Sequence, residues 1–142
     1  MRPANAVVAF APVTDLTMTN PSWRNNIETD AFLGPFIKPL VKLPRWFLAC
    51  ATRIPMGRPV NHPELSPLFG NLDHLPPTLI QVSRDEVLYD DAQRYANKAN
   101  KAGSNVELNV WPTLVNVFQA FEALPESGAA QQLAADFLIA RP

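Results

Sequence analysis

Two turns of this chain carry side chains that could take part in proton transfer. Asp85 and Glu86 lie just past an apolar run, residues 78–83, and Asn116 lies in the turn 112–118 that follows a second run, residues 106–111, in which apolar and polar residues alternate. In open parallel sheets, reactive groups lie beyond the carboxyl ends of the strands. A carboxylate there can accept a proton or orient a base, whereas a neutral amide only forms hydrogen bonds. Both turns are therefore candidate site loops.

The elements that would position these loops follow from hydrophobic periodicity. Residues 78–83 and 106–111 predict two strands, and the helical spacing of apolar residues from Leu88 to Ala99 predicts a helix between them that stops at Gly103. Strand, helix and strand form a right-handed parallel unit. Residues 6–10 predict a third buried strand, and residues 129–138 a final helix. We therefore expect an α/β fold with about three parallel strands and flanking helices.

The segment from Ala31 to Thr52 has a different, amphipathic pattern. Apolar and basic residues alternate at helical spacing around its axis: Phe36, Leu40, Leu43 and Phe47 on one face, and Lys38, Lys42 and Arg45 on the other. We expect a lid-like segment whose apolar face packs over the sheet. An interfacial helix on an anionic membrane is the alternative, but Pro35, Pro39 and Pro44 would interrupt it.

Composition excludes several classes of function. A net charge of −1 and the lack of a basic run give no basis for binding nucleic acid. The single cysteine, Cys50, and two distant histidines fit no zinc spacing, and we expect neither metal nor cofactor. The first residues lack the apolar core of a signal peptide, and no run reaches the roughly 18 apolar residues of a membrane span. We expect one domain's worth of chain in the cytoplasm.

Several stretches resemble the hormone-sensitive-lipase-like branch of the α/β-hydrolases, the bacterial esterase and lipase group also called fold-3 hydrolases. These are residues 11–17, 21–23, 65–72, 75–82, 85–92, 106–112 and 117–119. The resemblance implies that residues 1–142 correspond to the C-terminal half of one such domain, with a lid-like insertion over about 24–60. It places Glu86 at the position of the triad acid, with Asp85 as a less favoured claimant, and Asn116 at the position of the triad histidine. Weaker implications are substrate contacts from Trp23, Phe32, Phe36 and Phe118, and from Trp46.

Most of the triad that this family needs is missing from the sequence. The sequence contains neither Gly-x-Ser-x-Gly nor His-Gly-Gly, so it encodes no nucleophile elbow and no oxyanion loop. Loss of a triad histidine alone lowers turnover by about 10⁶ in subtilisin. His62 and His74 are the only possible substitutes, and neither has a positioned partner in the sequence. Without a histidine to orient, Glu86 could instead cap the helix near Val87, just as Asp15 and Thr17 could cap their own loop.

Three functions remain open. The first is a catalytically incompetent C-terminal portion of an ester hydrolase. The second is a subunit completed by an N-terminal chain that carries the nucleophile, because strand 6–10 would otherwise expose an apolar edge; self-association through that edge is a variant. The third is a noncatalytic module that binds a lipid or membrane surface through the basic segment 36–53.

Overall fold

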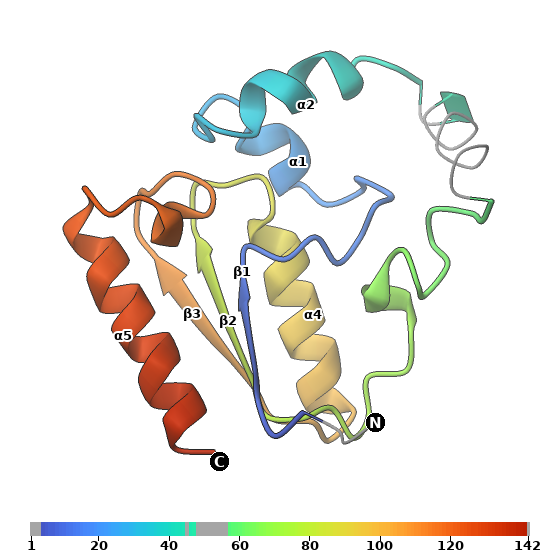
Figure 1. The fold of residues 1–142 in the computed structure, drawn as a ribbon. Helices are drawn as coiled ribbons and strands as arrows, with labels where there is room; N and C mark the ends of the chain where they lie inside the picture. Colours follow the sequence, from blue (N-terminus) through green and yellow to red (C-terminus); the bar gives the residue numbers. More distant parts are fainter. Residues whose placement is uncertain (1–3, 45, 48–56, 142) are drawn as a thin grey trace.

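Three parallel strands form the centre of the protein in a computed structural model that describes residues 4–44, 46–47 and 57–141 (Figure 1). The strands are β1 (Val7–Phe10), β2 (Thr78–Ser83) and β3 (Val106–Trp111), in the order β1-β2-β3. Val7 pairs with Thr78, and Thr78 with Val106. All six residues of β2 are buried, as its apolar sequence predicts for a central parallel strand. The predicted partial α/β fold is confirmed.

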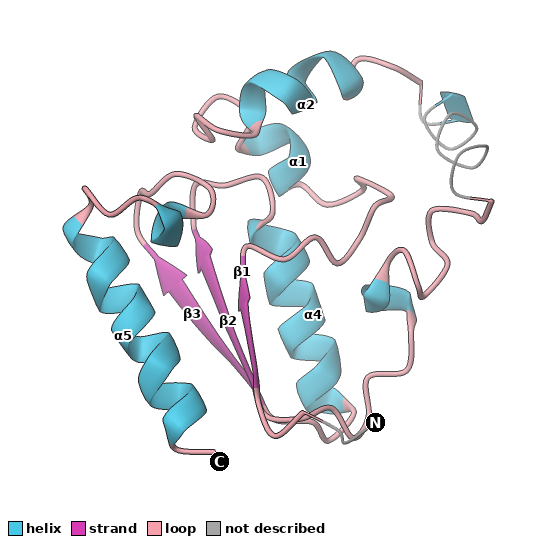
Figure 2. Cartoon of the chain, in the orientation of Figure 1, coloured by secondary structure: helices cyan, strands magenta, loops and turns pink. Residues whose placement is uncertain are grey.

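The two long helices cover opposite faces of this sheet (Figure 2). Helix α4 (Tyr89–Lys101) packs Ala92, Ala96 and Ala99 against Ile80 and Val82 of β2. Helix α5 (Pro125–Ile139) lies on the other side, where the Gln81 side-chain amide donates a hydrogen bond to the carbonyl oxygen of Ala130. Since alternate residues of a strand point to opposite faces, Gln81 faces α5 while its neighbours face α4.

Four further helical elements within the described residues are short. They are α1 (Ser22–Asn25), α2 (Gly34–Leu40) and the 3₁₀ turns η1 (Pro67–Phe69) and η2 (Phe118–Ala120). Helices α1 and α2 lie above the carboxyl ends of the strands (Figure 2). None of the helices in the described ranges combines the length and apolarity needed to cross a bilayer.

The register predicted for the lid-like segment is wrong. Phe36 is 69% exposed, and Leu43 and Phe47 are also exposed, whereas Ile37 is buried with Leu33 and Leu40 beside it. The apolar face of α2 that packs inward is therefore formed by Leu33, Ile37 and Leu40, with Ile37 in place of Phe36. It packs against Trp23, Ile27 and Leu88, which belong to a second core cluster below the segment. Helix α2 ends at Leu40, close after Pro39, as expected from the prolines that interrupt this segment. Arg45 and residues 48–56, Cys50 among them, lie outside the described residues.

Strand β1 is an edge strand. Within the described residues it pairs with β2 alone, and its residues are half-buried or exposed. An apolar pocket of about 230 Å³ lies beside it, lined by residues that include Val7, Ala9, Ile80 and Tyr95. The edge and this pocket leave apolar surface available next to the first strand.

Candidate functional site

The two candidate site loops are joined at the carboxyl ends of β2 and β3. Ser83 and Trp111 are register partners, and the backbone N–H of Arg84 donates to the carbonyl oxygen of Trp111 at 2.9 Å. The hydroxyl oxygen of Ser83 also accepts a hydrogen bond from the backbone N–H of Leu114 at 3.0 Å. The loop that carries Glu86 is thus tied to the loop that carries Asn116, as the parallel topology predicts.

Glu86 is an acid buried in the loop that follows β2. Its side chain is 1% exposed, and neither carboxylate oxygen has a hydrogen-bond partner among the described residues. Burial is the main cause that raises the pKa of Glu86 to about 8; the Ser83 backbone partly offsets the rise without reaching hydrogen-bond geometry, and the nearby Asp30 carboxylate adds a smaller contribution to it. Such an acid is protonated at neutral pH unless a cation is placed beside it.

Glu86 does not cap the following helix, contrary to the structural alternative drawn from the sequence. Helix α4 begins at Tyr89, and no side chain caps it at Leu88. Its first turn is held instead by a reciprocal pair, in which the backbone N–H of Ser22 donates to Asp90 and that of Asp90 donates to the Ser22 hydroxyl. The carboxylate of Glu86 therefore has no structural hydrogen bond to explain its presence.

Asn116 is the polar residue buried in the second site loop. It is 2% exposed, and its Nδ2 has no hydrogen-bond partner within the described part of the chain. The next residue, Val117, has a left-handed backbone with φ of 53°, which turns the chain directly into η2. A β-branched residue adopts this conformation at a cost, and such strain is typical of site loops. Glu86 and Asn116 thus present unsatisfied polar atoms from adjacent loops.

Two of the aromatic residues predicted as substrate contacts lie in the core. Trp23 is 3% exposed, and its indole N–H donates to Asp91 Oδ1 at 3.0 Å. Phe118 is 1% exposed and packs on Trp111 with ring centroids 5.3 Å apart. These contacts give both residues a structural role, and their part in substrate binding stays a prediction. Asp91, which the sequence did not single out, also accepts from the Asp15 backbone and from the Asn20 side chain, and burial raises its pKa.

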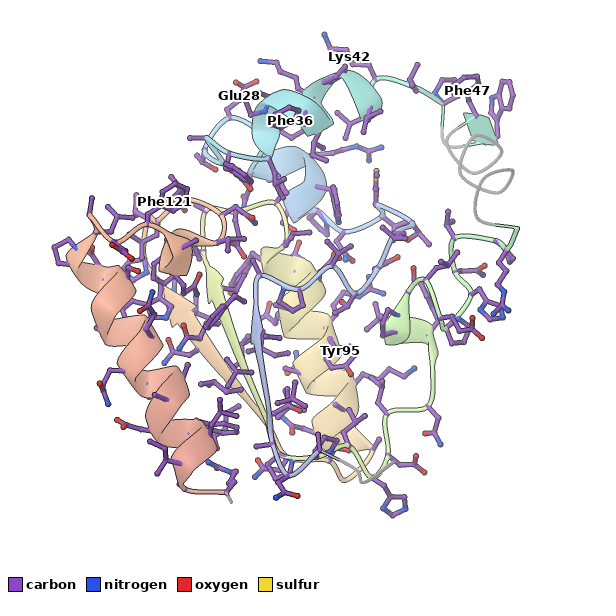
Figure 3. The ribbon with its side chains drawn as sticks, in the orientation of Figure 1. Glu28, Phe36, Lys42, Phe47, Tyr95 and Phe121 are labelled. Carbon is purple, nitrogen blue, oxygen red and sulfur yellow. The ribbon has the colours of Figure 1, made fainter. Side chains whose placement is uncertain are left out.

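An apolar pocket of about 420 Å³ opens between the lid-like segment and the second site loop. One wall is formed by Ala31 and Phe32, and the other by Val115, Phe121, Ala123 and Leu124. Figure 3 shows Phe121 on the loop before α5, whereas Phe36 projects from α2. Phe32 lines this pocket and Phe36 does not. Because Val115 precedes Asn116 in the chain, the pocket adjoins the candidate site.

Residues 2–120 match the model of a protein family described as having the alpha/beta hydrolase fold. The chain belongs to this α/β-hydrolase family. It is 37% identical over 134 residues to an esterase of Acinetobacter venetianus, and 38% identical over 128 residues to the carboxylesterase/phospholipase LipF of Mycobacterium tuberculosis. The crystal structure of a hormone-sensitive lipase from a metagenome library superposes with a TM-score of 0.82 and 26% identity, over 99% of this chain and 46% of that one. The resemblance to the hormone-sensitive-lipase-like branch is confirmed.

The α/β-hydrolase chain described here spans less than half of these relatives. The alignments cover 94% of it but 42% of the Acinetobacter esterase, and 86% of it but 32% of LipF. The two histidines of this part of the fold lie away from both site loops. His74 is exposed in the turn before β2, at the opposite end of the sheet, and His62 accepts a hydrogen bond from the backbone of Glu64 in its own loop.

Other acidic residues bear on a capped loop, a possible metal site and the turn at Asp30. Asp15 accepts hydrogen bonds from the backbone and hydroxyl of Thr17, which confirms the capped loop. Within the described residues, no three His, Cys, Asp or Glu side chains converge in a way that could hold a metal ion. Asp30, near Glu86, was missed. The turn signal that Asp30 gives before Phe32 and Leu33 could have predicted its bonds to their backbone, but not its contact with the Glu86 loop.

Proposed function

We propose that this chain forms the acid-bearing half of a carboxylic ester hydrolase site and that the 142-residue polypeptide alone does not hydrolyse esters. The observation that carries the proposal is Glu86, a buried carboxyl group without a hydrogen-bond partner among the described residues, on a loop tied to the loop of Asn116. Natural proteins seldom bury an unpaired acid without a functional reason. Glu86 fits the role of an acid that orients a catalytic base.

The missing chemistry follows from what this site contains. Ester hydrolysis on this fold needs a serine nucleophile, a histidine that takes its proton, an acid that orients the histidine and donors for the oxyanion. Asn116 stands at the position proposed for the histidine, and its amide takes no proton at neutral pH. Glu86 alone cannot activate a serine that the 142 residues do not contain in a nucleophile elbow.

The apolar pocket beside Asn116 supports an ester with an apolar acyl or alcohol group as the substrate class. Its lining by Phe32, Val115, Phe121 and Leu124 offers a surface for hydrocarbon, and about 420 Å³ lies within the range of small-molecule sites. Among the aromatic residues that the sequence suggested, only Phe32 lines this pocket. The lid-like role of residues 24–60 and the cytoplasmic location remain predictions.

The direct test is an activity measurement on the purified chain. p-Nitrophenyl butyrate should give no turnover above buffer, and a fluorophosphonate probe, which labels activated serines, should leave the chain unlabelled. Active-site serine labelling in stoichiometric amount would contradict the proposal. The Ser83→Ala variant is the control for nonspecific labelling at the site loop, because Ser83 is the serine nearest in sequence to Glu86. A label that disappears in this variant was attached to Ser83.

A second candidate is a subunit completed by a chain that carries the nucleophile. The free edge of β1 and the adjoining apolar pocket favour it, since a further parallel strand could pair there. Co-expression with the part of the Acinetobacter esterase that the alignment does not cover tests this idea. Co-purification of the two pieces would support it, whereas a monodisperse monomer in the presence of that piece would count against it.

A further inference from the structure

The start of the lid-like segment forms a row of hydrogen bonds along the Glu86 loop. The Asn26 side-chain amide donates to the carbonyl oxygens of Arg84 and Glu86, each at 2.9 Å. The Thr29 hydroxyl donates to the carbonyl oxygen of Asp85 at 2.9 Å. Asp30 Oδ2 accepts from the backbone N–H of Val87 at 3.0 Å. Each residue from 84 to 87 therefore has one backbone group hydrogen-bonded to a side chain of this segment. We call the three residues that form these bonds, Asn26, Thr29 and Asp30, the clamp.

The clamp is built into the lid-like segment itself. Asp30 is 1% exposed, and its other oxygen accepts from the backbone N–H groups of Phe32 and Leu33 at 3.1 and 2.8 Å. The carbonyl oxygen of Asp30 accepts from Gly34, where helix α2 begins. A Cβ at Gly34 would collide with the carbonyl oxygen of Ile27, so α2 can approach this turn closely only with glycine there. One buried carboxylate thus joins the first turn of α2 to the acid loop.

Apart from the clamp, the Glu86 loop is held at its two ends, where the backbone N–H of Arg84 donates to the carbonyl oxygen of Trp111 at 2.9 Å and the Ser22 hydroxyl donates to the carbonyl oxygen of Val87 at 2.7 Å. The Glu86 carboxylate has no partner in the described structure, and the backbone contacts within the loop are long, with 3.4 Å between Glu86 N and Ser83 O and 3.2 Å between Tyr89 N and Glu86 O. The side chains of the clamp satisfy carbonyl and N–H groups that would otherwise be unpaired in this turn. The position of the Glu86 backbone therefore depends on residues more than 50 positions earlier in the chain.

We propose that Asn26, Thr29 and Asp30 are positioning residues for Glu86, so that the lid-like segment and the acid loop move as one body. The function of the clamp as an aid to catalysis rests on the proposed function above; its mechanical role does not. Phe32, which donates to Asp30, also lines the apolar pocket. A group bound in that pocket would therefore contact Phe32, which belongs to the same turn as Asp30.

Amide hydrogen exchange on the 142-residue chain, followed residue by residue by NMR, tests the clamp. Asp30→Asn should speed exchange of the Val87 amide by about tenfold, because loss of one charge-assisted hydrogen bond costs on the order of 1.5 kcal/mol. Asn26→Ala and Thr29→Val should each speed exchange at Glu86 and Val87 by about threefold or more. Thr29 is exposed, so Thr29→Val leaves the core intact and serves as the variant that folds. The amide of Ile80 in β2 should stay within about twofold in all three variants.

Asn100→Ala is the matched control. The Asn100 side chain also forms two hydrogen bonds with backbone groups, the carbonyl oxygen and the N–H of Val106, but at the opposite end of the sheet. It should speed exchange near Val106 and leave Glu86 and Val87 unchanged. A second readout is the titration of the Glu86 carboxyl carbon. Its midpoint should fall in Thr29→Val, because a loosened loop admits water to a buried acid, and should not move in Asn100→Ala.

The outcomes are decisive in both directions. Faster exchange confined to residues 84–88, together with the lower Glu86 midpoint, supports the clamp. Unchanged exchange at Val87 in Thr29→Val and Asn26→Ala overturns it, and so does equal acceleration at Val87 and Ile80, which would show general destabilisation only. None of these results depends on esterase activity, so the clamp and the proposed function can fail separately.

Discussion

The hydroxyl oxygen of Ser83 accepts a hydrogen bond from the backbone N–H of Leu114 at 3.0 Å, across the carboxyl ends of two parallel strands. This bond joins the loop of a buried acid to the loop where the hydrolase fold would supply a base. Ser83 is itself fully buried, so its hydroxyl is held within the fold and has no contact with solvent. The candidate site is therefore a property of the β2–β3 pair, and its predicted chemistry depends on what those two loops carry.

Glu86 should make the stability of the fold decrease as pH rises. Its pKa in the folded state is about 8, above the ordinary 4.5, so between these values the folded chain holds a proton that the unfolded chain has released. Stability then falls by up to about 1.4 kcal/mol per pH unit in that window. Glu86→Gln should flatten the slope and stabilise the chain at pH 8. Urea unfolding of both chains at pH 5 and pH 8 measures this change in the free energy of unfolding.

Asp85→Asn is the control for that measurement, since Asp85 is its neighbour in the same loop but is only half-buried. Its pH slope should match that of the unsubstituted chain. Asp91, whose pKa is also raised by burial, contributes a slope of the same sign, but it is present in every variant and cancels in the comparison. An equal pH slope for Glu86→Gln and the unsubstituted chain would show that Glu86 is not the group that titrates.

Asn116→His should alter the Glu86 acid without creating an esterase. An imidazolium at 116 would favour the charged form of Glu86 and lower its pKa, provided that the two adjacent loops place these side chains together. Turnover of p-nitrophenyl butyrate should stay at the buffer rate because the 142 residues contain no nucleophile elbow. Carboxyl-carbon NMR and the ester assay measure the two effects. Thr113→His, at an exposed position of the same loop, should shift the Glu86 midpoint less, and turnover by Asn116→His alone would refute our account of what is missing.

Trp23→Phe should weaken the fold and leave the apolar pocket unchanged. The indole N–H donates to Asp91 Oδ1 at 3.0 Å inside the core, so its removal loses a hydrogen bond to a buried carboxylate. We expect a loss of about 2–3 kcal/mol in the free energy of unfolding. Phe32→Ala, at an exposed pocket wall, should cost less than about 1 kcal/mol. Equal stability of Trp23→Phe and the unsubstituted chain in urea would show that the hydrogen bond from Trp23 to Asp91 does not stabilise the fold.

Periodicity predicted the sheet well because β2 and β3 lie between helices that need apolar partners. It failed for α2, where Phe36 and Ile37 are adjacent apolar residues and either could begin a helical stripe. Contacts with Trp23 and Ile27 decide the register, and no local pattern contains them. The same limit applies to the clamp. Asp30 is recognisable as a turn residue, but its bond to Val87 spans 57 positions and depends on the tertiary fold.

Membrane binding through the lid-like segment should be weak. Phe36, Trp46 and Phe47 are exposed there, which would favour an interface, but Lys38 pairs with Glu28 at 2.6 Å and this reduces its attraction to anionic lipid. Sedimentation with vesicles of phosphatidylcholine alone and with phosphatidylserine added should show little binding in either case. Glu28→Gln frees Lys38 and should increase binding to the anionic vesicles only, in a manner that salt reverses. Strong, salt-sensitive binding of the unsubstituted chain would instead favour the noncatalytic lipid-surface module.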